Sequence, residues 1–146
     1  MVDRALAVDA WESLFRAQHE VFELIRRDFE GSALTQPEYD VLLTVTRSSG
    51  MTARLRDVTE QMLISQPSVS RLVDRMVESG LVTKCADPED GRGSLITATE
   101  HGARLFRTMG GAHARHVSEL MSALDTPELE SLKAITSKLR ASLHRA

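Results

Sequence analysis

Hydroxyl, amide and guanidinium side chains gather in one short stretch of the chain, between residues 65 and 75. Serine hydroxyls and a glutamine amide both donate and accept hydrogen bonds, which suits them to the edges of DNA bases and to phosphate oxygens. An arginine adds a paired contact to a guanine edge or to a phosphate. On one exposed face, these groups would offer readout of a DNA groove. They are Ser65, Gln66, Ser68, Ser70, Arg71 and Arg75.

The apolar residues of the same stretch predict a helix that would present this face. They recur at helical spacing, so they form an inward stripe and turn the polar residues outward. The helix is expected to start near Gln66 or Pro67 and to end at Gly80. A short helix over Leu55–Met62 precedes it across a tight turn. The inward stripe comprises Val69, Leu72, Val73, Met76 and Val77.

A β-hairpin is predicted directly after this pair of helices. Two runs with strand character, 81–86 and 94–99, are separated by the turn-forming residues 87–93, which include Arg92. A polar face on a single amphipathic helix is most often only a solvated surface. The hairpin favours the other interpretation, because a helix fits the DNA major groove while a hairpin reaches the neighbouring backbone and minor groove.

Longer helices are predicted on both sides of this central part. Apolar residues at helical spacing indicate helices over about 7–30, 35–48, 100–124 and 126–143. Thr35 and Glu38 have the spacing of a capping box at the start of the second of these. Gly110 and Gly111 interrupt the helix over 100–124, and indicate either a bend or close backbone packing.

Composition limits the remaining classes of function. The chain has 146 residues, of which 27% are charged, and no apolar run of membrane-spanning length, so a cytoplasmic location is expected. Its single cysteine, Cys85, excludes an intrachain disulfide. The net charge of -3 argues against DNA binding unless the positive charge is concentrated locally. No nucleophile–base pair or phosphate-binding glycine loop has a recognisable spacing, so neither an enzyme nor a cofactor is expected.

Taken together, four stretches resemble the multiple-antibiotic-resistance regulator (MarR) family of bacterial transcription factors, and the similarity extends from about Trp11 to the end. The resemblance implies a mainly α fold with a small β-hairpin wing, a winged helix-turn-helix of about six helices. Residues 1–146 would form a single domain, with 34–99 as the DNA-binding lobe and 1–33 and 100–146 as dimerisation helices. The stretches that carry the resemblance are 34–42 (LTQPEYDVL), 66–76 (QPSVSRLVDRM), 80–82 (GLV) and 87–92 (DPEDGR).

The resemblance also implies partners and residue roles. Members bind double-stranded operator DNA of pseudopalindromic sequence as homodimers, commonly as repressors that respond to a small aromatic or anionic effector. Ser68, Ser70 and Arg71 match the positions that contact the major groove and phosphates. Asp90 would brace the wing and Arg92 would enter the minor groove. Gly91 replaces the first arginine of the usual pair at the wing tip and Gly93 follows, which predicts a more flexible wing and weaker or more salt-sensitive DNA binding.

Three inputs could regulate such a protein, and a second class of function stays open. Oxidation of Cys85 beside Lys84 is one, and metal binding by His113 and His116 is another. The third input is a small molecule in a pocket lined by Trp11, Phe15, His19, Tyr39 and Leu42.

The main alternative function is a winged-helix scaffold that contacts proteins and no longer binds DNA.

Overall fold

The computed structural model describes residues 1–63 and 67–145, which form six α-helices, two short 3-10 helices and three strands. The chain divides into two compact units, Met1–His113 and Ala114–Ala146. None of the described helices is both long enough and apolar enough to cross a membrane. The elements are α1 (Arg4–Arg26), η1 (Arg27–Phe29), α2 (Gln36–Arg47), η2 (Ser49–Met51), β1 (Thr52–Arg54), α3 (Leu55–Gln61), α4 (Val69–Glu78), β2 (Val82–Asp87), β3 (Asp90–Ala98), α5 (Glu100–Leu120) and α6 (Thr126–Leu143).

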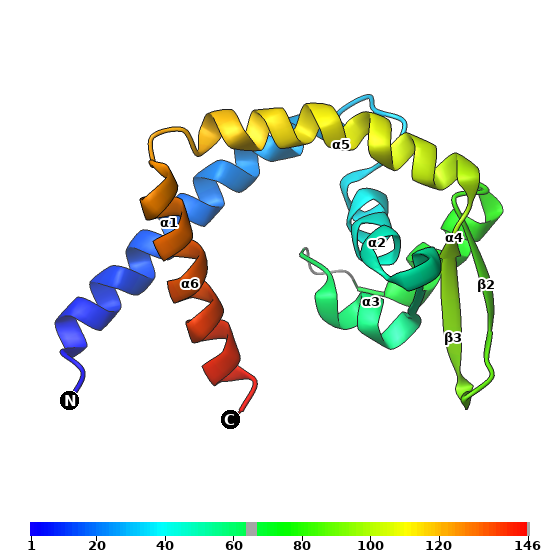
Figure 1. Cartoon of the computed structure of the whole chain (residues 1–146), viewed down its shortest axis with the longest axis horizontal. Coiled ribbons are helices and arrows are strands. Elements are labelled where there is room, and N and C mark those ends of the chain that lie inside the picture. The colour runs from blue at the N-terminus through cyan, green and yellow to red at the C-terminus, as the bar shows by residue number, and fades with distance from the viewer. Residues whose placement is uncertain (64–66, 146) are drawn as a thin grey trace. The chain divides into compact units, whose positions relative to one another are not determined.

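A small antiparallel sheet and three short helices make up the central lobe (Figure 1). The strand order is β1-β3-β2, with Ala53 opposite Ile96 and Lys84 opposite the same residue from the other side. Helices α2 and α3 contact β3, while α4 contacts β2. This is the architecture of a winged helix-turn-helix, in which the β2–β3 hairpin is the wing, as the sequence predicted.

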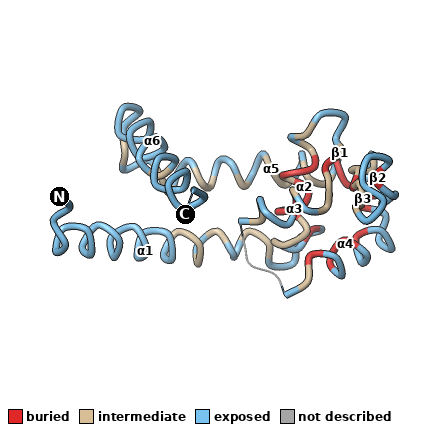
Figure 2. The backbone as a smooth tube through the Cα atoms, turned by 90° about the horizontal axis from the view of Figure 1, so that it is seen from below, coloured by how far each residue is buried: buried red, intermediate tan, exposed pale blue. Residues whose placement is uncertain are grey.

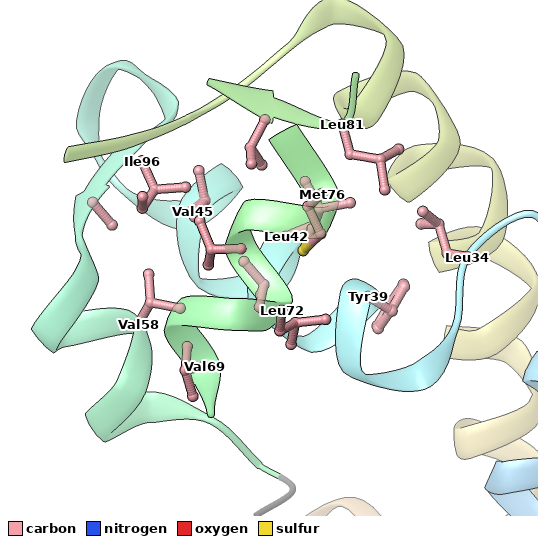
Figure 3. Packing of buried hydrophobic residues seen from close by; sticks show 14 residues of the cluster. Leu34, Tyr39, Leu42, Val45, Val58, Val69, Leu72, Met76, Leu81 and Ile96 are labelled. Atoms are coloured by element: carbon pink, nitrogen blue, oxygen red, sulfur yellow. The ribbon is translucent and has the colours of Figure 1, made fainter. Parts of the chain in front are cut away.

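The hydrophobic core lies inside this lobe (Figure 3). Removing these side chains from water supplies the main favourable free energy of folding. The core draws on every element of the lobe, so it fixes α2, α3, α4 and the sheet against one another. Its largest fully buried side chains are Leu34, Leu42, Met76, Ile96, Val41, Val45, Val58, Val73 and Val82.

Local sequence signals set several of the element ends. The predicted capping box is present at the start of α2, where Thr35 Oγ1 accepts from the Glu38 amide at 3.3 Å and Glu38 Oε1 accepts from the Thr35 amide at 2.9 Å. Gly80 ends α4 with a φ of +76°, a conformation that other residues rarely adopt. These two signals fix the start of the lobe and the entry into the wing.

The structure differs from the sequence predictions around the central helix. Helix α4 begins at Val69 instead of near Gln66 or Pro67, because Ser68 is its N-cap. Val77, predicted to face inward, is 39% exposed and lies one residue before the end of the helix. Strand β1 was not predicted, because its three residues are too few for a periodic pattern.

The wing strands also differ from the prediction: β2 is shifted by one residue and β3 is longer. They extend to Asp87 and Asp90, which pair with each other across the turn, and a bulge lies between Ala86 and Asp87. The turn is therefore tighter than the seven residues, 87–93, that the sequence analysis assigned to it.

Helices α1 and α6 each expose apolar side chains, and neither contains a buried residue (Figure 2). A helix that leaves leucine and aromatic side chains in water gains little from burial within its own chain. On α1 the exposed large hydrophobic residues are Leu6, Val8, Trp11, Leu14, Phe15 and Leu24; on α6 they are Leu129, Leu132, Ile135, Leu139 and Leu143.

Replacing Gly102 by alanine tests the junction between α5 and the sheet. An added Cβ would collide with the carbonyl oxygen of Leu81 and lie 2.9 Å from its carbonyl carbon. Because backbone cannot move aside cheaply, we expect Gly102→Ala to lower the free energy of unfolding by about 1–3 kcal/mol. Chemical denaturation measures this, with Gly91→Ala as the control, since a Cβ there meets nothing within 4 Å. Equal stabilities of the two variants would contradict the close contact.

Candidate nucleic-acid interface

Helix α4 divides into a buried side and a polar, exposed side. Its buried side chains are Val69, Leu72, Val73 and Met76. Ser70, Arg71 and Arg75 lie on the opposite side and are exposed, as the helical spacing predicted. This arrangement leaves hydroxyl and guanidinium groups along one face of a helix that is otherwise anchored in the core.

Ser68 has a structural role at the start of α4. Its Oγ accepts a hydrogen bond from the Arg71 amide at 3.2 Å, so the hydroxyl caps the helix. A serine hydroxyl that accepts one hydrogen bond still carries a hydrogen that it can donate, for example to a phosphate. The other two predicted contact residues before the helix, Ser65 and Gln66, lie outside the described residues.

A buried carboxylate holds the chain just before this helix. Asp40 on α2 is only 3% exposed, and its Oδ2 accepts from the Leu63 amide at 2.7 Å. The bond links α2 to the segment that follows α3, across 23 residues of sequence. Sequence reasoning missed Asp40; the available signal was a charged residue between Tyr39 and Val41, both of which are buried.

The tip of the wing carries exposed Arg92 next to several carboxylates. Asp90 Oδ1 accepts from the Arg92 amide at 3.1 Å, and Asp87 Oδ1 accepts from the Glu89 amide at 2.9 Å. Asp90 therefore stabilises the turn itself. The contact between the wing and the rest of the lobe involves Asp87 and Glu89, which pair with Arg54 at the end of β1. The sequence analysis identified none of these three.

Arginine side chains are exposed on α4 and on the wing although the whole chain is acidic. They are Arg71 and Arg75 on α4 and Arg92 on the wing. The groove of about 430 Å³ between α3 and the wing is lined by both signs of charge: Arg54, Arg56 and Arg92 with Glu60, Asp87 and Asp90. Local potential, and not the net charge, determines whether a surface attracts phosphate.

The five residues of the predicted effector pocket fall into two groups in the structure. Trp11, Phe15 and His19 stack in succession along exposed α1, with ring centroids 5.7 and 6.5 Å apart. Leu42 is fully buried in the core, and Tyr39 is only 8% exposed. None of the five lines the groove between α3 and the wing or the hollow at the start of α6.

Tyr39 belongs to a compact aromatic cluster within the first unit. Its ring centroid lies 5.3 Å from Phe29, 4.8 Å from Phe106 and 5.3 Å from His113. Desolvation by burial raises the pKa of the Tyr39 phenol above its ordinary value, and the charge of Arg47 offsets part of this. The phenol is therefore neutral at physiological pH and can donate a hydrogen bond.

The residues considered for redox and metal sensing are less organised. Cys85 is an exposed free thiol on β2. The ammonium of its neighbour Lys84 is 3.0 Å from Asp74 Oδ1, so that cation is already paired. Within residues 1–63 and 67–145, no three histidine, cysteine or acidic side chains come together in a way that could hold a metal ion. His113 pairs with Asp28 instead, with Nδ1 3.1 Å from Oδ2.

Comparisons with known proteins match this architecture. The family model described as MarR family matches residues 34–93. YhbI of Bacillus subtilis, a transcriptional regulator of the helix-turn-helix type, is 24% identical over 131 residues, which cover 90% of this chain and 82% of YhbI. The structure of Sco3205, a MarR family regulator from Streptomyces coelicolor in complex with DNA, superimposes with a TM-score of 0.82 at 21% identity and covers 98% of this chain and 91% of that one.

A further similar structure is that of BpsR from Bordetella bronchiseptica, a protein whose DNA binding is regulated by 6-hydroxynicotinic acid. It superimposes with a TM-score of 0.74 at 22% identity, and covers 88% of this chain and 91% of BpsR. A structural similarity at 22% sequence identity shows that two proteins share a fold.

Substitution of Asp40 tests its part in holding the segment before α4. Asp40→Ala leaves the Leu63 amide without its acceptor, so we expect the free energy of unfolding to fall by about 1–3 kcal/mol. Asp40→Asn keeps an acceptor oxygen and should lose less. Amide hydrogen exchange gives the local readout: the Leu63 amide should exchange faster in Asp40→Ala than in the native chain. An unchanged exchange rate at Leu63 would show that the hydrogen bond does not hold this segment.

Proposed function

We propose that the chain is a DNA-binding transcriptional regulator of the MarR family, whose model matches residues 34–93, and that it is a repressor that binds a pseudopalindromic operator as a homodimer. One observation carries the proposal: the exposed polar face of α4 and the exposed Arg92 of the wing belong to the same compact lobe. A helix of this kind fits the major groove, and a hairpin beside it reaches the next stretch of backbone.

Each contact residue takes a role that follows from its chemistry and place. Ser70 and Arg71, in the first turn of α4, contact base edges, because the amino end of a recognition helix enters the groove first. Ser68 donates its hydroxyl hydrogen to a phosphate while it caps the helix. Arg75, one turn further on, contacts the backbone, and Arg92 enters the minor groove. Ser65 and Gln66 are proposed as further contacts at the start of this surface.

A homodimer accounts for the exposed apolar side chains of the terminal helices. A second copy of the chain would cover the leucine and aromatic side chains of α1 and the leucines of α6, each helix considered by itself. Two lobes then present two copies of α4 to successive major grooves, about 34 Å apart along the duplex. Residues 1–33 and 100–146 are accordingly proposed as the dimerisation helices and 34–99 as the DNA-binding lobe.

A small aromatic or anionic effector is proposed to release the DNA. The regulation of BpsR by 6-hydroxynicotinic acid supports this class of ligand. In this chain the stacked rings of Trp11, Phe15 and His19 offer an aromatic surface on α1. Tyr39 adds a neutral phenol, while Leu42 would contribute only where the core opens, since it is fully buried.

The alternative function is a winged-helix scaffold that contacts only proteins. It would require no cationic surface, whereas Arg71, Arg75 and Arg92 are all exposed here. This observation favours DNA binding over the scaffold.

Arg71→Ala separates the two functions. In fluorescence anisotropy with the upstream region of the protein's own gene, we expect the variant to bind at least roughly tenfold more weakly than the native chain, because a paired guanidinium contact is lost. Arg107→Ala removes an exposed arginine from α5 and serves as the control for charge. Equal affinity of the native chain and Arg71→Ala would contradict the assigned role. No binding by the native chain to any segment of this region would favour the scaffold.

A further inference from the structure

Arg54 connects the start of the helix-turn-helix to the tip of the wing. It is the last residue of β1 and directly precedes α3. Its Nε lies 3.0 Å from Asp87 Oδ2, and its Nη2 lies 2.6 Å from Glu89 Oε2. One guanidinium therefore binds two carboxylates, that of Asp87 at the end of β2 and that of Glu89 in the turn that follows, and charge-assisted contacts of this kind are directional.

The contact between Arg54 and the two carboxylates lies past the last residue pair of β1 and β3. Strand β1 pairs with β3 only as far as Arg54, which is opposite Leu95. From Ser94 to Asp90, β3 is paired only with β2, so the outer part of the hairpin projects past β1. The Arg54 side chain extends the connection from the last paired residue of β1 to the turn. Without it, the outer hairpin would be held only through its own two strands.

Asp87 is the buried partner of Arg54 in this connection. Its side chain is 3% exposed, and both carboxylate oxygens have partners: Oδ1 accepts from the Glu89 amide and Oδ2 contacts Arg54. A buried carboxylate is costly unless it is paired and hydrogen-bonded. The bulge between Ala86 and Asp87 changes the register at this point of the hairpin.

Gly93 lies close to the acidic residues of the turn. A Cβ at this position would lie 3.3 Å from Asp90 Oδ2, a tight contact, and 3.4 Å from Asp87 Cβ, an ordinary van der Waals contact. In the sequence, Gly93 predicted a more flexible wing. In the structure, its lack of a side chain permits close packing against Asp87 and Asp90. Arg54, Asp87 and Arg92 line the same groove between α3 and the wing, so the contact at Arg54 sets the spacing across that groove.

We propose that Arg54 is a positioning residue for DNA recognition: it holds the wing against the start of α3 through Asp87 and Glu89, and thereby sets where Arg92 meets the DNA. The proposal rests on the proposed function, and it assigns Arg54 no contact with DNA. A wing that is already held in place loses less conformational freedom on binding, so the complex dissociates more slowly.

A double-mutant cycle between Arg54 and Arg92 tests the proposal. The variants are Arg54→Met, Arg92→Ala and the two combined, each assayed by anisotropy on the same upstream DNA over a series of salt concentrations. We expect Arg54→Met alone to weaken binding roughly tenfold, mainly through faster dissociation. In the Arg92→Ala background it should change neither the affinity nor the salt dependence, because the wing then has no arginine to position.

Arg56→Met is the matched control. Arg56 is exposed, belongs to α3 and lines the same groove, but neither Asp87 nor Glu89 pairs with it. Its removal should have the same effect on binding whether or not Arg92 is present. Hydrogen exchange of the free protein supplies an independent readout, in which the amides of residues 89–94 should exchange faster in Arg54→Met and at the native rate in Arg56→Met.

Stability is checked in parallel, because a partner of a buried carboxylate is removed. If Arg54→Met does not fold, Glu89→Gln replaces it in the cycle, since Glu89 is 77% exposed and its loss leaves Asp87 paired. Equal effects of the Arg54 substitution in the two backgrounds would overturn the proposal, and so would native exchange rates across residues 89–94. Failure of the native chain to bind its upstream DNA would instead overturn the proposed function on which the proposal rests.

Discussion

Burial of one stripe of α4 is the interaction on which the rest of the structure depends. Val69, Leu72, Val73 and Met76 lie in the core of the lobe, where each buried side chain of this size contributes about 1.5–3 kcal/mol (Figure 3). A helix has 3.6 residues per turn, so burial of one stripe also fixes the direction of the other. The exposure of Ser70, Arg71 and Arg75 is thus a consequence of core packing and needs no separate stabilisation.

Polar contacts position the segments that the core does not reach. The carboxylates of Asp40 and Asp87 are both almost fully buried, and each holds a part of the chain with little apolar surface of its own. Asp40 binds the Leu63 amide before α4, and Asp87 binds Arg54 near the tip of the wing. The hydrophobic core sets the orientation of the recognition helix. The carboxylates of Asp40 and Asp87 position the segment before this helix and the wing after it.

Features encoded by neighbouring residues could be predicted from the sequence, whereas contacts between distant residues could not. The capping box at Thr35, the buried side of α4 and the stop at Gly80 follow from local spacing. Strand β1 depends on pairing with residues more than 40 positions away, and Arg54 has its partners in the wing. Helix α5 continues through Gly110, where a Cβ would lie in ordinary van der Waals contact with the Tyr39 hydroxyl, at 3.4 Å, a neighbour that local spacing could not identify.

The most direct test of the central claim asks whether DNA covers the polar face of α4. In a Cys85→Ser background, which removes the native thiol, cysteine is placed at exposed Ser70 or, as a control, at exposed Thr108 on α5. The rate of reaction with a maleimide is then measured with and without saturating upstream DNA. The account predicts that DNA slows the reaction of Ser70→Cys strongly and leaves that of Thr108→Cys unchanged. Equal rates for Ser70→Cys in the free protein and in the saturated complex would contradict it.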